Sequence, residues 1–153
     1  MHCPPHKLLI VDDNPFFSAC LASLVNAEPD MVVCGDACSG ASLEKSLKEC
    51  SPDVILMDLG LGAESGLGIA RRLRRKDVAT PFVFISSLGA PAAATLRRIG
   101  RCAFWKKGDS DDGILRTIRK VLADSAAQGD TMGSQVRKAA AGGGRAAILN
   151  RRS

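Results

Sequence analysis

The stretch Asp53-Val54-Ile55-Leu56-Met57-Asp58-Leu59-Gly60 decides how this chain folds. Residues 54–57 are apolar without interruption, which is typical of a strand that is buried on both faces of a parallel sheet. The run stops at Asp58, so its carboxylate is expected at the carboxyl end of that strand. Ligands of open α/β sheets bind at this edge. Because aspartates that end strands also serve as turn residues, Asp58 needs support from elsewhere in the chain.

Other apolar runs also end in polar side chains that can do chemistry. In chain order these are residues 8–11 before Asp12 and Asp13, residues 81–85 before Ser86 and Ser87, and residues 103–105 before Lys106 and Lys107. If the strands take the doubly wound order 2-1-3-4-5, the first and third strands are neighbours. The carboxylates of Asp12, Asp13 and Asp58 then converge at one edge of the sheet.

The segments between these runs have the pattern of helices. Apolar residues recur at helical spacing in residues 15–25, 41–50, 66–75, 91–99 and 111–122. We expect a loop at 60–66, N-caps at Asn14, Ser65 and Ser110, and a solvated helix face made of Arg71, Arg72, Arg74 and Arg75. With a further strand at 31–34, five repeats of strand then helix predict an α/β fold whose parallel sheet carries helices on both faces.

Composition divides the 153 residues into a body and a tail. We expect an N-terminal extension at 1–6, one domain at 7–123 and a disordered tail at 124–153, where alanine, glycine and polar residues replace the apolar pattern. Five of the 21 Lys and Arg lie in residues 131–153 without an acid, and the other 16 balance the 16 Asp and Glu, so the net charge of +5 belongs to residues 131–153. No apolar run approaches the roughly 18 residues of a membrane span and no signal peptide is present, so we expect a cytoplasmic protein.

The six cysteines contain no CxxC pair, and several occupy apolar positions of the expected strands and helices. We therefore expect reduced thiols that act as small hydrophobic side chains. Metal binding is the alternative, either by Cys34 with Cys38 or by Cys3 with His2 and His6. Neither group has a partner cluster at zinc spacing, which disfavours this alternative.

Three converging carboxylates repel one another unless a cation joins them. Mg2+ is the natural choice, because it binds one or two carboxylates together with water and a phosphate oxygen. An ammonium group from Lys107 and a hydroxyl from Ser86 complete a site for a phosphoryl group. Phosphoryl transfer depends mainly on positioning and on charge neutralisation, so Asp58 is the expected acceptor, forming an aspartyl phosphate.

The combination resembles the receiver domain of two-component response regulators over residues 7 to about 123. The matching motifs are Asp12-Asp13, Asp58 at the end of residues 54–57, Ser86 at the end of residues 81–85, and Phe104-Trp105-Lys106-Lys107. The resemblance implies a flavodoxin-like fold, with a doubly wound five-stranded parallel sheet of order 2-1-3-4-5 and five helices. It also implies a phosphoacceptor that takes part in its own phosphorylation and dephosphorylation, rather than an enzyme with a separate substrate.

The resemblance assigns roles to the matching residues. Asp58 is the phosphoacceptor, and Mg2+ is held by Asp13 directly, by Asp12 largely through water, by Asp58 and by the backbone carbonyl of Gly60. Lys107 pairs with the phosphoryl group, and Lys106 is the alternative one residue away. Ser86 and Phe104 form the switch, although a turn serine and a core aromatic are also ordinary at these positions. The donor is a phosphohistidine on a sensor kinase or phosphotransfer protein, and the output is binding to a downstream protein or a homodimer.

The chain departs from the family pattern near the acceptor. Gly62 and Gly108 stand where proline is usual, and Ser65 stands where an acidic residue is common. We therefore expect a mobile loop after Asp58 and leave the conformation of the Lys107–Gly108 peptide open. Gly60 lacks a side chain, so water reaches the site easily and the phosphoryl group is expected to be short-lived.

Three rival functions come from other classes. A receiver-like scaffold without phosphorylation is disfavoured because every reactive residue is retained. A truncated DNA-binding regulator remains open, but the residues after the domain contain no helix-turn-helix pattern and the basic tail lacks interleaved aromatics, which disfavours nucleic acid. A hydrolase of the haloacid dehalogenase type usually has a second aspartate two residues after the first, and position 60 is glycine.

Overall fold

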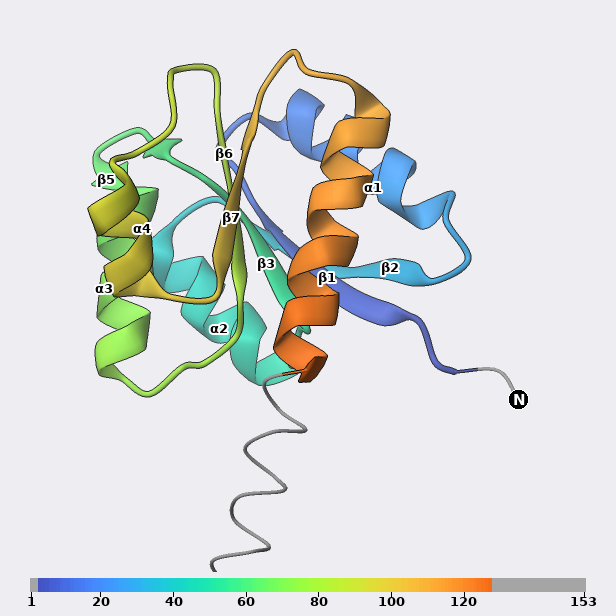
Figure 1. The fold of residues 1–153 in the computed structure, drawn as a ribbon, viewed down its shortest axis with the longest axis horizontal. Helices are drawn as coiled ribbons and strands as arrows, with labels where there is room; N and C mark the ends of the chain where they lie inside the picture. Colours follow the sequence, from blue (N-terminus) through green and yellow to red (C-terminus); the bar gives the residue numbers. More distant parts are fainter. Residues whose placement is uncertain (1–2, 128–153) are drawn as a thin grey trace, which may run out of the picture. The chain divides into compact units, whose positions relative to one another are not determined.

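A five-stranded parallel sheet forms the centre of the computed structural model, which describes residues 3–127 (Figure 1). Its order is β2-β1-β3-β6-β7, and each neighbouring pair is parallel. The strands are β1 (His6–Val11), β2 (Met31–Ala37), β3 (Val54–Asp58), β6 (Phe82–Ser86) and β7 (Cys102–Lys106). The predicted doubly wound order is confirmed, and the neighbours β1 and β3 bring Asp12, Asp13 and Asp58 to one edge.

Helices cover both faces of the sheet, as predicted (Figure 1). One face packs against α1 (Pro15–Asn26) and residues 111–122 of the final helix; the other packs against α2 (Gly40–Cys50), α3 (Gly66–Arg75) and α4 (Ala93–Ile99). Strand residues alternate between these two cores, as the pleat requires. Leu8 and Ile10 face α1, whereas Leu9 and Val11 face the opposite core.

Helix α1 begins at Pro15, two residues after Asp13 and close to the end of β1. The side chain of Asn14 accepts hydrogen bonds from the backbone N–H groups of Phe16 and Phe17 at 3.0 and 3.3 Å, and Pro15 occupies the first turn. The predicted cap at Ser110 also forms, with a hydrogen bond from the N–H of Gly113 at 3.2 Å. These caps set where each helix begins next to the sheet edge.

The segment after Asp58 differs from the loop expected at 60–66. Strand β4 (Gly60–Leu61) pairs antiparallel with β5 (Glu64–Ser65). A tight hairpin requires positive φ, which Gly62 adopts at 63°. The carboxylate of Glu64 accepts a hydrogen bond from the N–H of Gly40 at 2.8 Å, at the start of α2. The expected mobile loop is therefore a hairpin anchored to a neighbouring helix.

Helix α3 starts without the expected side-chain cap. Ser65 occupies the N-cap position but makes no capping hydrogen bond with its side chain. The N–H of Gly66 instead donates to the carbonyl of Leu59 at 3.0 Å. A Cβ at position 66 would collide with the carbonyl oxygen of Asp58, so glycine allows α3 to start against the end of β3.

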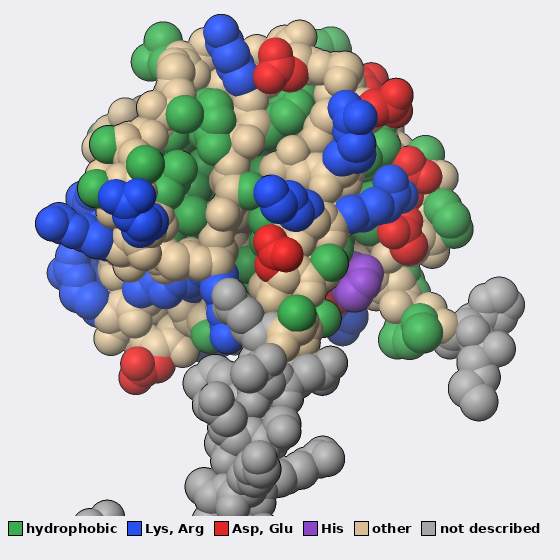
Figure 2. All heavy atoms as spheres, viewed as in Figure 1, with side chains coloured by type: hydrophobic (Ala, Val, Ile, Leu, Met, Phe, Trp, Pro, Cys, Tyr) green, Lys and Arg blue, Asp and Glu red, His purple; other side chains and the backbone are tan. Residues whose placement is uncertain are grey.

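One arginine of α3 contradicts the predicted solvated face. The guanidinium of Arg74 donates to the backbone carbonyls of Val78, Thr80, Ile99 and Gly100, at distances from 2.7 to 3.3 Å. It also lies 4.7 Å from the ring centroid of Phe82, and burial lowers its pKa. Arg71 and Arg75 are exposed as predicted, and Lys and Arg side chains gather over α3 and α4 in Figure 2.

Two cysteines contradict the prediction that all thiols are reduced. Cys34 of β2 and Cys50 at the end of α2 form a disulfide, with their Cα atoms 5.9 Å apart. The pairing arises because α2 runs back along β2, which brings residues separated by 16 positions together. Cys38 is a free, exposed thiol, so the alternative Cys34–Cys38 metal pair is not assembled.

The final helix runs through residues 111–127 and so includes residues 124–127, which were predicted to belong to the disordered tail. Ala126 and Ala127 are strong helix formers, which explains the extension. The rest of the predicted tail, 128–153, and residues 1–2 with the proposed ligand His2 lie outside the described residues. Within residues 3–127, no helix has both the length and the apolar character needed to cross a membrane.

Candidate functional site

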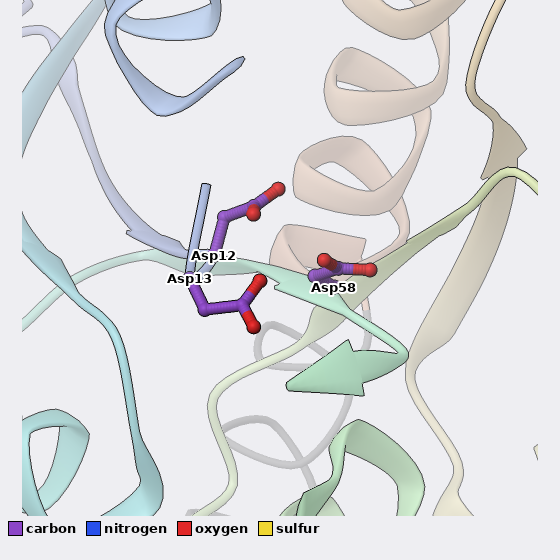
Figure 3. A group of neighbouring side chains, drawn as sticks. All are labelled: Asp12, Asp13 and Asp58. Atoms are coloured by element: carbon purple, nitrogen blue, oxygen red, sulfur yellow. The ribbon is translucent and has the colours of Figure 1, made fainter. Parts of the chain in front are cut away.

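Three carboxylates meet at the carboxyl edge of the sheet, as predicted. Asp12 and Asp13 follow β1, and Asp58 ends β3 (Figure 3). Each offers one carboxylate oxygen, and these oxygens lie within 4.8 Å of one another. Asp12 and Asp58 are only 6% and 7% exposed, whereas Asp13 is exposed. Oxygen ligands at this separation fit a hard divalent cation such as Mg2+, with one face left open to solvent.

The two buried carboxylates are held in the same way. One oxygen of Asp12 accepts a hydrogen bond from the N–H of Asn14 at 2.8 Å, and one oxygen of Asp58 accepts one from the N–H of Gly60 at 3.2 Å. The other oxygen of each faces the Lys107 ammonium, whose Nζ lies 3.2 Å from Asp12 and 3.4 Å from Asp58. Backbone contacts thus fix both carboxylates, while their second oxygens face the ammonium and would be shared with any bound cation.

The pKa of Asp58 is raised above its ordinary value. Loss of solvent through burial is the main cause, and the nearby negative charge of Asp12 adds to it. The N–H of Gly60 and the ammonium of Lys107 act in the opposite direction without cancelling the effect. The charged form of Asp58 is therefore incompletely compensated, which favours binding of a further positive charge.

Lys107, rather than Lys106, reaches the carboxylates. Its backbone N–H donates to the carbonyl of Ser86 at 2.8 Å, which continues the pairing of β6 and β7 beyond the last strand residue. Lys106 is exposed and does not border the cavity around Asp58. The two adjacent lysines therefore have different surroundings, a distinction that their sequence alone leaves open.

A cavity of about 530 Å3 surrounds the reactive groups. Its lining brings together Asp12, Asp13, Asp58, Gly60, Ser86 and Lys107. Ser86 is 6% exposed, and its Oγ accepts a hydrogen bond from the N–H of Leu88 at 3.0 Å, which leaves the hydroxyl proton free to donate. The volume is ample for a phosphoryl group, with hydroxyl and ammonium donors next to the carboxylate of Asp58.

Residues 8–119 match the family model of the response regulator receiver domain. The chain belongs to this family. Similar proteins include a protein-glutamate methylesterase/protein-glutamine glutaminase of Pyrococcus horikoshii, 32% identical over 111 residues that cover 71% of this chain and 30% of that protein. The uncharacterized transcriptional regulatory protein YvfU of Bacillus subtilis is 29% identical over 117 residues, which cover 76% of this chain and 58% of that protein. The chain spans about a third of the length of the methylesterase relatives.

Solved receiver structures have the same fold. The response regulator domain of Thermotoga maritima CheB is 28% identical, with a TM-score of 0.68 over 78% of this chain and 98% of that domain. A LuxR-family two-component response regulator from Aurantimonas has a TM-score of 0.73 at 22% identity, covering 79% of this chain and 87% of that one. The family and the fold expected from the sequence are therefore confirmed.

The two predicted switch residues, Ser86 and Phe104, lie on the neighbouring strands β6 and β7 and have different surroundings. Ser86 borders the cavity, whereas Phe104 in the middle of β7 is half-buried and packs with the core on the α2, α3 and α4 face. Phe17, one of the apolar residues at helical spacing in residues 15–25, lies against Lys107, with 4.2 Å between Nζ and the ring centroid. The sequence places Phe17 four residues after Asp13, which could have indicated a position near the site. Helical spacing of core residues explains the same position, so the contact with Lys107 was not predictable.

Proposed function

We propose that this receiver is a phosphorylation switch in two-component signalling, with Asp58 as the acceptor. The observation that carries the proposal is the buried Asp58 carboxylate, which faces the Lys107 ammonium beside two further carboxylates in one cavity. An oxygen of Asp58 attacks the phosphorus of a phosphohistidine on a sensor kinase or phosphotransfer protein. A P–O bond forms, the P–N bond breaks, and the electron pair returns to the imidazole nitrogen.

The acidic residues are suited to hold Mg2+ during this transfer. Asp13, Asp12, Asp58 and the carbonyl of Gly60 are the proposed ligands, and Asp13 is the exposed member of the set. A bound Mg2+ supplies positive charge for the phosphoryl oxygens. The chain's own residues do the rest: Gly60 and Asn14 fix the two buried carboxylates, Lys107 pairs with a phosphoryl oxygen, and Ser86 donates a hydrogen bond to another.

The output of the switch is binding to a downstream protein in the cytoplasm, or formation of a homodimer. Ser86 is the proposed sensor of the phosphoryl group because its hydroxyl proton is free, and Phe104 is the proposed aromatic that moves with it. Gly60 places no side chain over the acceptor and has open space where a Cβ would lie. Water therefore reaches Asp58, which supports a short lifetime of the phosphoryl group. A half-life of many hours would contradict this part of the proposal.

Intact mass measurement tests the acceptor directly. Wild type and Asp58→Ala are incubated with acetyl phosphate, with Mg2+ or with EDTA, and then with a phosphorylated sensor kinase domain. We expect wild type to gain one phosphoryl group only when Mg2+ is present, and Asp58→Ala to gain none. If folded wild type gains no phosphoryl group from either donor, the chain is a receiver-like scaffold and the proposed chemistry is wrong.

A further inference from the structure

The ring of Phe17 lies against the ammonium of the reactive lysine. Phe17 belongs to the first turn of α1, where its N–H is capped by Asn14, and the Lys107 Nζ lies 4.2 Å from the ring centroid. This distance is well within the range of a cation–π interaction. The ring is half-buried and packs against the core under α1, so its position is determined by the fold.

The side chain of Lys107 has few other constraints. The next residue is Gly108, with φ at 98°, so no proline ring stiffens this turn. The polar partners of the ammonium are the carboxylates of Asp12 and Asp58. Both carboxylates are also proposed ligands of Mg2+, and a bound cation competes for their oxygens. The aromatic contact does not depend on those oxygens, and Mg2+ does not compete for it because this ion takes oxygen ligands.

We infer that Phe17 is a positioning residue for phosphoryl transfer, and that its ring keeps the Lys107 ammonium beside Asp58 when the carboxylates are engaged elsewhere. The inference rests on the proposed function, since it concerns the same acceptor. The ring acts through Lys107 and does not touch the reacting atoms. Gly108 leaves the turn after Lys107 flexible. Contact with the Phe17 ring from α1 restricts the ammonium instead.

The chain offers a closely matched control at the preceding residue. Phe16 is 77% exposed, and its N–H shares the Asn14 cap, so Phe16→Leu makes the same chemical change in the same helical turn without altering the ring at position 17. A variant that strengthens the contact is also possible, because Phe17 and Trp105 border a cavity of about 130 Å3. Phe17→Trp has room in this cavity and presents the aromatic face that binds cations most strongly.

NMR of the Lys107 side chain in Mg2+-free buffer tests the contact itself. Protons on the carbon next to Nζ should be shifted upfield by the ring current, relative to those of the exposed Lys106. We expect this shift to vanish in Phe17→Leu and to persist in Phe16→Leu and Phe17→Trp. An unchanged Lys107 shift in folded Phe17→Leu would overturn the inference. If Phe17 had only a structural role, Phe17→Leu would lower the melting temperature but would leave the upfield shift of the Lys107 protons unchanged.

The rate of Mg2+-dependent phosphorylation by acetyl phosphate tests the consequence. We expect Phe17→Leu to react about two- to fivefold more slowly than wild type, the change that corresponds to one partly exposed cation–π contact. Phe16→Leu should match wild type, and Phe17→Trp should react at least as fast as wild type. Equal rates for the two leucine variants overturn this inference alone. A folded wild type that accepts no phosphoryl group overturns the proposed function, and this inference with it.

Discussion

At the residue scale, Asp58 combines burial with an unbalanced charge. Its pKa is raised, chiefly by burial, so the folded state holds this proton more tightly than the unfolded state, where the carboxyl has its ordinary pKa of about 3.9. Stability from this group is complete below the unfolded pKa and is lost as the pH rises through the folded pKa. Above the folded pKa, Asp58 is charged and this buried charge lowers the stability of the fold. A bound cation can offset that loss.

We predict that Asp58→Asn increases the free energy of unfolding at pH 7 without divalent cations, by up to about 1 kcal/mol, because the amide removes the uncompensated charge. The gain should shrink as the pH falls through the raised pKa of Asp58, because the wild-type carboxyl then takes up its proton. Urea unfolding from pH 4 to pH 8 measures both, with exposed Asp109→Asn as the control. A variant that is less stable than wild type at pH 7 would contradict the prediction.

At the element scale, Arg74 joins α3 to two neighbouring segments. Its guanidinium satisfies carbonyls in the connection after α3, at Val78 and Thr80, and at the end of α4, at Ile99 and Gly100. Arginine suits this role because its planar donors reach several acceptors at once. Without the guanidinium of Arg74, these carbonyls lose a charged donor and remain partly shielded from water.

We predict that Arg74→Ala lowers the free energy of unfolding by about 2–4 kcal/mol, because several shielded carbonyls lose hydrogen bonds to a charged donor. Arg75→Ala, one residue away on the exposed side of the same helix, should change it by no more than about 0.5 kcal/mol. Chemical denaturation of both variants gives the comparison. Equal effects would mean that the carbonyl contacts of Arg74 contribute nothing to stability.

The disulfide joins β2 to the end of α2. Cys34 and Cys50 are 16 positions apart, and closing a loop of this size is worth about 3 kcal/mol in the chain-entropy account. We predict that Cys50→Ser lowers the free energy of unfolding by about 2–3 kcal/mol, whereas Cys38→Ser, at an exposed free thiol, leaves it unchanged. Peptide mapping without reductant should recover the linked peptides. Free thiols at both positions in protein purified without reductant would contradict the pairing.

At the scale of the whole molecule, the proposed cation site connects distant parts of the chain. Asp12 and Asp13 follow the first strand, and Asp58 ends the third, so a cation bound there stabilises the assembled sheet over the unfolded chain. We predict that Mg2+ raises the melting temperature, corresponding to about 2.7 kcal/mol at a hundred times its dissociation constant. Calorimetry at matched ionic strength measures the effect.

The matched variant for this prediction is Asp13→Asn, which removes the exposed ligand and leaves the buried pair of Asp12 and Asp58 in place. Its melting temperature should respond to Mg2+ much less than that of wild type. An equal response in wild type and Asp13→Asn would show that Mg2+ acts elsewhere on the protein.

Much of the architecture was predictable because it depends on local pattern. Uninterrupted apolar runs such as residues 54–57 identify buried strands, helical spacing identifies the segments between them, and the residue that ends each run lies at the strand's carboxyl end. These rules bring Asp12, Asp13, Asp58 and Ser86 to one edge. The order of the strands is not local, and it was predicted correctly only through the family resemblance.

By itself, then, the sequence determined the alternation of strands and helices and which residue ends each strand, since both depend on neighbours within a few positions. Tertiary structure decided which lysine faces Asp58, that Phe17 lies against its ammonium, and that Arg74 binds backbone carbonyls of other segments. It also decided that Cys34 meets Cys50. The physical reason is the same throughout: each of these contacts joins residues from different elements, so it exists only after the helices have packed on the sheet.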